Sequence, residues 1–205
     1  MKILIVDDHA VIRAGLKQLC ADTGAKVLEA ESGTAALGLQ KNERPQLTVL
    51  DLNMPGLSGL ELLRQLLECD PAARILIFSM HGEPVYAANA LRIGAKGYLS
   101  KNASPEELRM ALSRILAGMT YVESEIAQHL AALPSEQRQQ LSERDLEILR
   151  LLGEGRSFTE IAACLGLGYK TVANAATAIK SKLGVARTAD LIRLSVEMGI
   201  GRLVP

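Results

Sequence analysis

The chain has 205 residues, of which 48% are hydrophobic and 22% charged, and its 23 basic side chains balance 23 acidic ones. These proportions are typical of one large or two modest globular domains, and 7 Pro and 17 Gly are too few for a low-complexity or collagen-like chain. No apolar run approaches the about 20 residues of a membrane-spanning helix, and the run Ile3–Val6 ends at two acids, unlike a signal peptide. We therefore expect a soluble, cytoplasmic protein with no membrane partner.

The three cysteines, Cys20, Cys69 and Cys164, lie far apart along the chain, each within an apolar helical pattern. They form no CxxC pair, and an odd number cannot pair fully, so a disulfide framework or a metal site is disfavoured. We expect all three to be buried as small hydrophobic side chains, which fits a reducing compartment such as the cytoplasm.

The first 120 residues alternate short apolar runs with amphipathic stretches. The runs predicted as strands cover residues 2–6, 25–30, 47–50, 74–78 and 97–99. The predicted helices cover residues 10–21, 33–42, 59–69, 84–93 and 105–117. The last helix begins after Ser104, and Glu107 is spaced to complete a capping box. Strand–helix alternation of this kind is typical of a parallel sheet covered by helices on both faces.

The composition changes near Thr120, where Glu, Gln, Ser and Ala become frequent. We predict a linker over residues 120–140 with a short helix at 124–133. No strand pattern follows, and four helices are predicted over residues 142–153, 157–165, 169–183 and 188–198, with capping boxes beginning at Ser142 and Ser157. Residues 141–205 hold nine basic and seven acidic side chains, a balance that permits nucleic-acid binding without requiring it.

Polar side chains stand where the predicted strands end. Asp7 and Asp8 follow the first strand, Asp51 the third, Ser79 the fourth and Lys101 the fifth. The carboxyl ends of parallel strands border the crevice where open α/β sheets bind ligands, so these side chains are expected to gather at one edge. The alternative is that each residue only ends its strand.

Clustered carboxylates repel one another unless a cation lies among them, and hard oxygen ligands suit Mg²⁺. A carboxylate can also act as a nucleophile and form an aspartyl phosphate. Asp51 is the candidate, because it stands at the tip of the middle strand. Lys101 would offset charge on phosphoryl oxygens and Ser79 would donate a hydrogen bond to them.

Asp7-Asp8 after a strand, Asp51 within LDLNMPGLSG, Ser79 after IF and Lys101 after GYLS together resemble the receiver domain of bacterial response regulators. The resemblance covers residues 2 to about 118 and implies a five-stranded, doubly wound, flavodoxin-like domain over residues 1–119, phosphorylated by a partner sensor histidine kinase. It also implies roles for individual residues. Asp51 would be the phosphoacceptor, Ser79 and Lys101 would contact the phosphoryl group, Tyr98 would be an aromatic switch, and Mg²⁺ would be held by Asp7, Asp8, Asp51 and the backbone carbonyl of Asn53.

The second region contains a predicted helix, a break at Gly166 and a second helix, an arrangement that can place the second helix in the major groove of DNA. The string from Leu141 to Val185 resembles the LuxR-type helix-turn-helix domain, over roughly residues 141–198. A receiver joined to such a domain resembles the NarL/FixJ family of response regulators. The resemblance implies a phosphorylation-controlled transcription factor rather than an enzyme, binding double-stranded DNA and forming a homodimer when phosphorylated, commonly through the helix 188–198.

The recognition helix departs from the family pattern. Many members read TVKxH, whereas this chain reads Thr171-Val172-Ala173-Asn174-Ala175. Asn174 could pair with adenine and Thr177 could pack on a thymine methyl, so weak or A·T-biased binding is expected. The positions that would face DNA, including three lysines for phosphates, are Lys170, Thr171, Ala173, Asn174, Thr177, Lys180 and Lys182.

Two other functions stay open. The alanine-rich recognition helix would also suit a signalling protein whose helical domain binds protein partners instead of DNA, and salt-dependent retention on DNA would separate these readings. A phosphatase-type hydrolase using Asp51 is disfavoured, because such enzymes carry a second acid two residues later, where this chain has Asn53.

Overall fold

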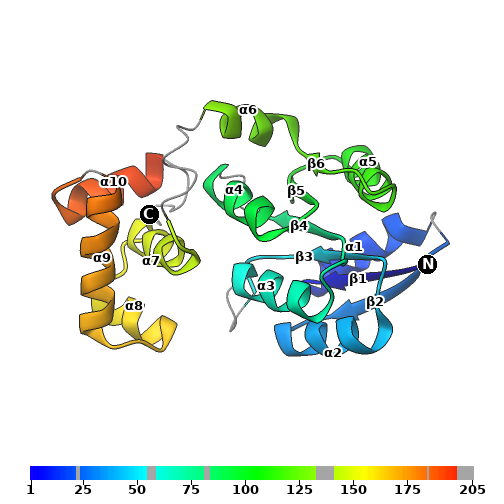
Figure 1. The fold of residues 1–205 in the computed structure, drawn as a ribbon, viewed down its shortest axis with the longest axis horizontal. Coiled ribbons are helices and arrows are strands. Elements are labelled where there is room, and N and C mark those ends of the chain that lie inside the picture. The colour runs from blue at the N-terminus through cyan, green and yellow to red at the C-terminus, as the bar shows by residue number, and fades with distance from the viewer. Residues whose placement is uncertain (22–23, 55–58, 81–83, 133–140, 184, 198–205) are drawn as a thin grey trace. The chain divides into compact units, whose positions relative to one another are not determined.

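The computed structural model describes residues 1–21, 24–54, 59–80, 84–132, 141–183 and 185–197 (Figure 1). The chain divides into two compact units, residues 1–82 with 89–127 and residues 83–88 with 128–205. Among the described residues, no helix combines the length and the apolar character that a membrane span requires.

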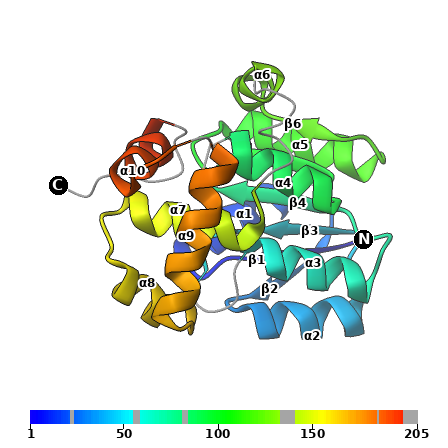
Figure 2. The same cartoon turned by 60° about the vertical axis from the view of Figure 1, so that its left-hand side comes forward.

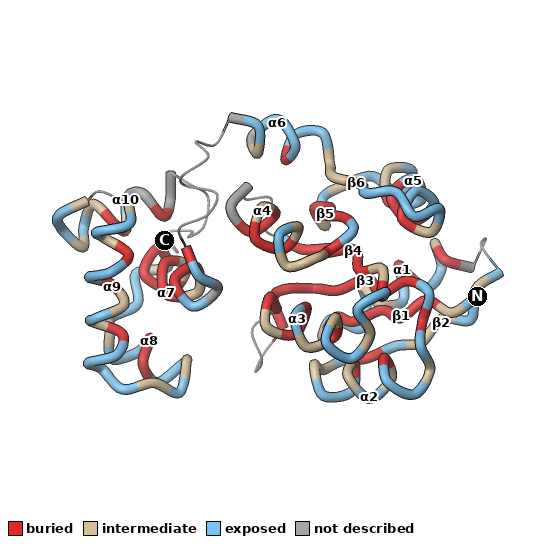
Figure 3. The backbone as a smooth tube through the Cα atoms, in the orientation of Figure 1, coloured by how far each residue is buried: buried red, intermediate tan, exposed pale blue. Residues whose placement is uncertain are grey.

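The first unit is built on one parallel sheet. Its strands are β1 (Lys2–Val6), β2 (Lys26–Ala30), β3 (Leu47–Leu50), β4 (Ile75–Ser79), β5 (Gly97–Ser100) and β6 (Tyr121–Val122), in the order β2-β1-β3-β4-β5-β6. The strands β3, β4 and β5 are buried along their whole length, whereas β2 at the edge is mostly not (Figure 3). Strands that are buried on both faces have continuous apolar sequences, so their positions could be predicted from the sequence.

Helices cover both faces of the sheet (Figures 1 and 2). They are α1 (Ala10–Ala21), α2 (Gly33–Glu43), α3 (Gly59–Cys69), α4 (Pro84–Ile93) and α5 (Pro105–Leu116). The helices α1 and α5 share one face, where Leu16 and Leu112 pack in a core with Ile3, Ile5 and Leu99. The helices α2 and α3 pack together on the other face.

The parallel α/β sheet is confirmed, and the predicted count of five strands is wrong by one. The sixth strand, β6, lies in the segment predicted as linker and pairs Tyr121 with Gly97 and Val122 with Tyr98. A strand of two residues is too short to produce a periodic pattern, since periodicity needs at least four residues. The sheet therefore continues past the predicted domain end at residue 119.

The connection to β6 has the opposite hand from the others. The connection through α1 runs from β1 to β2, toward one edge of the sheet, and the connection through α3 runs from β3 to β4, toward the other edge. The two helices lie on opposite faces of the sheet, so the two connections have the same hand. The connection from β5 through α5 to β6 runs in the same direction as that through α3, yet α5 packs beside α1. Since about 98% of such connections are right-handed, β6 is an uncommon addition whose contacts need an explanation of their own.

The second unit is helical, as predicted. After α6 (Ser124–Ala132) come α7 (Glu143–Gly153), α8 (Phe158–Leu165), α9 (Tyr169–Leu183) and α10 (Thr188–Glu197). Both predicted capping boxes are present, Ser142 with Asp145 and Ser157 with Glu160. Gly166 ends α8 with a φ of +63°, a left-handed conformation that favours glycine. Residues 133–140 of the predicted linker, residue 133 of its helix and residue 198 of the last helix lie outside the described residues.

Two local predictions are confirmed only in part. The capping box at α5 is only half present: Ser104 Oγ accepts the Glu107 N–H at 3.1 Å, while the Glu107 carboxylate accepts the Tyr121 hydroxyl at 2.9 Å. Cys20 is buried, but Cys69 and Cys164 are exposed. In both cases tertiary placement decides an outcome that local pattern leaves open.

Candidate functional site

The site is built where β1 and β3 end side by side. Asp7 and Asp51 follow these two strands, and their backbone N–H groups donate to Ala30 O at 3.1 Å and to Val6 O at 2.9 Å. The strand order changes direction at β1, with β2 on one side and β3 on the other, and such a switch point opens a crevice at the carboxyl ends. The sheet ladder thus fixes the backbone of both aspartates before any ligand binds.

Three carboxylates and a histidine meet in this crevice. Asp7, Asp8, His9 and Asp51 each offer a ligand atom, and these atoms lie within 4.8 Å of one another. Asp7 and Asp51 are 1% exposed, whereas Asp8 is partly exposed. The predicted gathering of acids at this edge agrees with this geometry.

His9 was not among the predicted site residues. Its Nδ1 lies 2.8 Å from Asp8 Oδ1 and 3.2 Å from Asp7 Oδ1, and its backbone N–H donates to Asp7 Oδ1 at 2.8 Å. An aspartate side chain that accepts the N–H two residues later forms a local turn. The sequence signal for His9 was its position directly after the acidic pair, which an ordinary loop histidine explains equally well.

Lys101 connects the two buried carboxylates. Its Nζ lies 2.7 Å from Asp51 Oδ2 and 2.7 Å from Asp7 Oδ2, and its side chain is 3% exposed. Burial lowers the pKa of Lys101, but hydrogen bonds to Asp51 and Asp7 outweigh it, so the pKa is raised overall. Burial raises the pKa of Asp51 more than Lys101 lowers it. One cation therefore serves two buried acids, which leaves negative charge uncompensated.

The donor set fits a hard divalent cation. Asp8 Oδ1 is buried and, within the described part of the chain, has no hydrogen bond of acceptable geometry. Carboxylate oxygens of this kind are the ligands that Mg²⁺ and Ca²⁺ prefer. An additional positive charge would also compensate the second buried carboxylate beside Lys101.

The other predicted site residues are Ser79, Tyr98 and Asn53, on or just after β4, β5 and β3. Ser79 ends β4 and is fully buried, and its carbonyl accepts the Lys101 N–H at 2.9 Å. Tyr98 is fully buried in β5. Asn53 contacts Asp51 through its backbone N–H, which donates to Asp51 Oδ1 at 3.0 Å. The structure thus places Asn53 shortly after β3 and Ser79 at the end of β4, whereas Tyr98 lies inside β5.

Gly59 shapes the chain just after Asp51, a role that sequence patterns did not indicate. A Cβ on Gly59 would stand 2.3 Å from the Cα of Leu52 and 2.5 Å from its carbonyl oxygen. No side chain fits at that distance, so the first turn of α3 can lie against Leu52 only because residue 59 is glycine. The backbone beside Asp51 is thereby held by α3.

The recognition helix α9 presents the predicted DNA-facing positions unequally. Its buried side is formed by Val172, Ala176 and Ile179. Lys182 Nζ lies 2.5 Å from Asp145 Oδ2, and the Thr177 hydroxyl donates to Ala173 O at 3.0 Å, so both groups already have partners within the helical unit. The remaining predicted positions are exposed or partly exposed: Lys170, Thr171, Ala173, Asn174 and Lys180.

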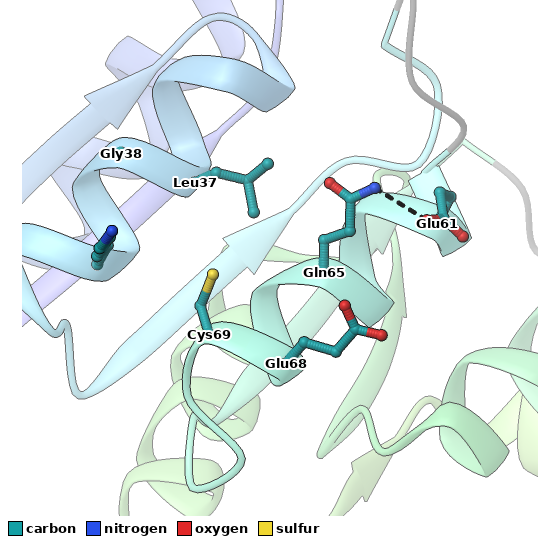
Figure 4. A pocket seen from close by; sticks show the side chains of 7 residues that line it. Leu37, Gly38, Glu61, Gln65, Glu68 and Cys69 are labelled. Carbon is teal, nitrogen blue, oxygen red and sulfur yellow. Dashed lines mark hydrogen bonds between the residues drawn. The ribbon is translucent and has the colours of Figure 1, made fainter.

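A separate hollow of about 550 Å³ lies between α2 and α3 (Figure 4). Gln65 lines it from α3 and donates a hydrogen bond to Glu61 of the same helix at 2.9 Å. The lining residues are Leu37, Gly38, Lys41, Glu61, Gln65, Glu68 and Cys69. None of these lining residues belongs to the acidic cluster at the ends of β1 and β3.

Comparison with known proteins identifies both parts of the chain. Residues 3–113 match the response regulator receiver domain, and residues 139–195 match the bacterial regulatory proteins of the luxR family. The chain is 40% identical to the transcriptional activator protein ExaE of Pseudomonas putida over 212 aligned residues, covering 99% of both. It is 33% identical to the response regulator GacA of Pseudomonas aeruginosa, covering 98% of this chain and 97% of GacA.

Solved structures agree. RcsB of Salmonella enterica serovar Typhimurium, bound to promoter rprA in the presence of phosphomimetic BeF₃⁻, superposes with a TM-score of 0.75 at 26% identity, covering 94% of this chain and 96% of RcsB. A LuxR-family two-component response regulator from an Aurantimonas species is 39% identical with a TM-score of 0.61, covering 64% of this chain and 95% of that one. This is a family of transcriptional regulators rather than of enzymes. The chain belongs to the response regulators that join a receiver domain to a LuxR-type helix-turn-helix domain.

Proposed function

We propose that Asp51 is the phosphoacceptor of a transcription factor that a sensor histidine kinase phosphorylates. The observation that carries this proposal is the buried triad in which the Lys101 ammonium lies 2.7 Å from both Asp51 and Asp7. A carboxylate in this position is fixed for in-line attack on a phosphoryl donor, and the ammonium is placed to offset charge on the transferred group.

The cation would be Mg²⁺, held by Asp7, Asp8, Asp51 and the backbone carbonyl of Asn53. When bound, it would neutralise the negative charge that gathers on the phosphoryl oxygens. Lys101 would then exchange part of its contact with Asp51 for the phosphoryl group. Ser79 would donate a hydrogen bond to that group, and Tyr98 would change its packing in response.

The output would be DNA binding by the helical domain, residues 141–205, as a homodimer formed on phosphorylation. Support comes from the similarity to RcsB, whose structure is a promoter complex in the presence of a phosphomimetic. Asn174 and Thr171 are exposed on α9 for base or backbone contacts, and Lys170 and Lys180 remain for phosphates.

A second function, binding of a protein partner by the helical domain, is favoured by one observation. Lys182 is paired with Asp145, so α9 offers fewer cations to DNA phosphates than its sequence indicates. The surface of α9 that would face DNA has two alanines and fewer charges available for phosphates. In this respect it resembles the centre of a protein–protein interface, where charged residues are depleted.

Labelling by acetyl phosphate in the presence of Mg²⁺ tests the phosphoacceptor. Asp51→Asn should abolish labelling, while Asp70→Asn, the same chemical change just after α3, should label like the wild type. Full labelling of Asp51→Asn would show that another residue accepts the phosphoryl group.

Selection of genomic fragments at fixed salt, with and without beryllofluoride, tests the output. Fragments enriched only with beryllofluoride and Mg²⁺ would support the gated transcription factor. No enrichment in either state, together with no salt-dependent retention on DNA, would favour the protein-binding alternative.

A further inference from the structure

The short strand β6 is held on β5 by several specific contacts. The Tyr121 N–H donates to Lys96 O at 3.0 Å, and the Tyr121 hydroxyl donates to Glu107 at 2.9 Å. Gly97 allows the close approach, because a Cβ there would stand 2.8 Å from the Tyr121 carbonyl oxygen. Strands usually have about five or six residues, so these contacts compensate for the shortness of β6.

Glu123 directly follows β6 and forms hydrogen bonds both with β5 and with the first turn of α6. Its N–H continues the ladder by donating to Tyr98 O at 3.1 Å. The next N–H on that side of β5, from Ser100, is not met by a backbone carbonyl; it donates to Glu123 Oε2 at 2.7 Å. The Glu123 carbonyl instead accepts the Ala127 N–H at 2.8 Å and so opens the first turn of α6. One residue thus closes the sheet edge with its side chain and starts the linker helix with its backbone.

Ser100 is the residue before Lys101, and the two are held from opposite sides. Glu123 binds the Ser100 N–H, and Ser79 O accepts the Lys101 N–H at 2.9 Å. Ser100 is only 7% exposed, so without Glu123 its N–H would lose a charge-assisted partner that water cannot readily replace. The backbone that carries the Lys101 ammonium would then be anchored on one side only.

We propose that Glu123 is a positioning residue for Lys101, acting through the Ser100 N–H, and that the same contact couples the phosphorylation site to helix α6. The inference rests on the proposed function, because it assigns to Lys101 a contact with the phosphoryl group. When Lys101 moves toward that group, the Ser100 N–H shifts with it, and Glu123 transmits the shift to the start of α6.

The test uses the full chain and two substitutions at one site. Glu123→Ala removes the acceptor, whereas Glu123→Gln keeps an oxygen that can accept the Ser100 N–H. The rate of labelling by acetyl phosphate should fall about tenfold in Glu123→Ala, the loss expected when a buried N–H is left without an acceptor, and stay within about twofold of the wild type in Glu123→Gln. Circular dichroism melting checks that both variants are folded.

Two controls separate this contact from a general loosening of β6. Tyr121→Phe removes the hydroxyl contact to Glu107 without touching Ser100, and Glu125→Ala removes a nearby exposed negative charge. Both should label within about twofold of the wild type, since each leaves the Ser100 hydrogen bond in place. Equal slowing in Tyr121→Phe and Glu123→Ala would overturn the proposal in favour of strand attachment alone.

Hydrogen exchange of residues 124–132 measures the coupling. Beryllofluoride with Mg²⁺ should change exchange there in the wild type and in Glu123→Gln, but not in Glu123→Ala. A response that persists in Glu123→Ala, or wild-type labelling in that variant, refutes the inference and leaves the proposed function intact. Absence of labelling in the wild type itself refutes the proposed function instead.

Discussion

The receiver unit and the helical unit hold their functional side chains in opposite ways. The side chains of Asp7, Asp51 and Lys101 are at most 3% exposed, and Lys101 contacts both aspartates at the ends of strands that are themselves buried. Thr171 and Asn174 are exposed on one face of α9. A buried charged site is cooperative, because removing one member leaves others unpaired, whereas an exposed reading face loses contacts one at a time.

The comparison predicts its largest effect at Lys101. Lys101→Ala leaves two buried carboxylates without their cation, so the free energy of unfolding should fall by about 3–5 kcal/mol in a metal-free buffer. Urea unfolding with and without Mg²⁺ measures this, and Mg²⁺ should restore part of the loss because it supplies positive charge to the same acids.

Lys96→Ala serves as the control for Lys101→Ala, since Lys96 is exposed just before β5. It should change the unfolding free energy by less than about 0.5 kcal/mol. A loss at Lys101 no larger than that at Lys96 would contradict the view that the acidic cluster depends on its lysine.

The next effect is expected at Gly59. Gly59→Ala forces a methyl group against the backbone of Leu52, and overpacking of this kind costs about 1–3 kcal/mol. Because Leu52 follows Asp51, acetyl phosphate labelling should slow as well.

Gly38→Ala in α2 is the matched control: a Cβ there has no neighbour within 4 Å, so alanine should stabilise the helix by about 0.5–1 kcal/mol. Thermal melting measures both variants, and a shift of the melting temperature in the same direction for both would argue against the close approach of Gly59 to Leu52.

A smaller and purely local effect is predicted in the helical unit. Ser142→Ala removes the side chain that accepts the Asp145 N–H at 3.2 Å, and the loss of an N-cap costs about 1 kcal/mol. Ser181→Ala, an exposed serine inside α9, should cost nothing, since alanine is the better helix former. Acetyl phosphate labelling should be unchanged in both, and reduced labelling in Ser142→Ala would weaken the contrast between the two units.

The smallest effect distinguishes two lysines of α9. Lys180→Ala should reduce the slope of log affinity against log salt by about 1, as expected for one lost phosphate contact. Lys182→Ala should change the slope less, because its ammonium is already 2.5 Å from Asp145 Oδ2. Fluorescence anisotropy across a salt series on one DNA fragment measures both, and equal slopes would mean that Lys182 leaves Asp145 to reach phosphate.

Much of the receiver site could be predicted because it lies at strand ends. The predicted strands at 2–6 and 47–50 agree with β1 and β3 to the residue, and Asp7 and Asp51 follow from where these strands stop. His9 and Gly59 were missed: His9 joins the acids through a local turn, and Gly59 matters only through a contact with Leu52. Neither feature has a periodic signature.

The sequence by itself determined the strand and helix pattern, the acidic edge of the sheet, the helix caps at Ser142 and Ser157, and the break at Gly166, because each depends on neighbours within a few residues. Only the tertiary structure decided that β6 joins the sheet, that Glu107 bonds Tyr121 rather than completing its cap, and that Glu123 holds Ser100. Whether two residues 14 or 23 positions apart form a hydrogen bond depends on how the chain folds back on itself, and patterns among neighbouring residues do not indicate this.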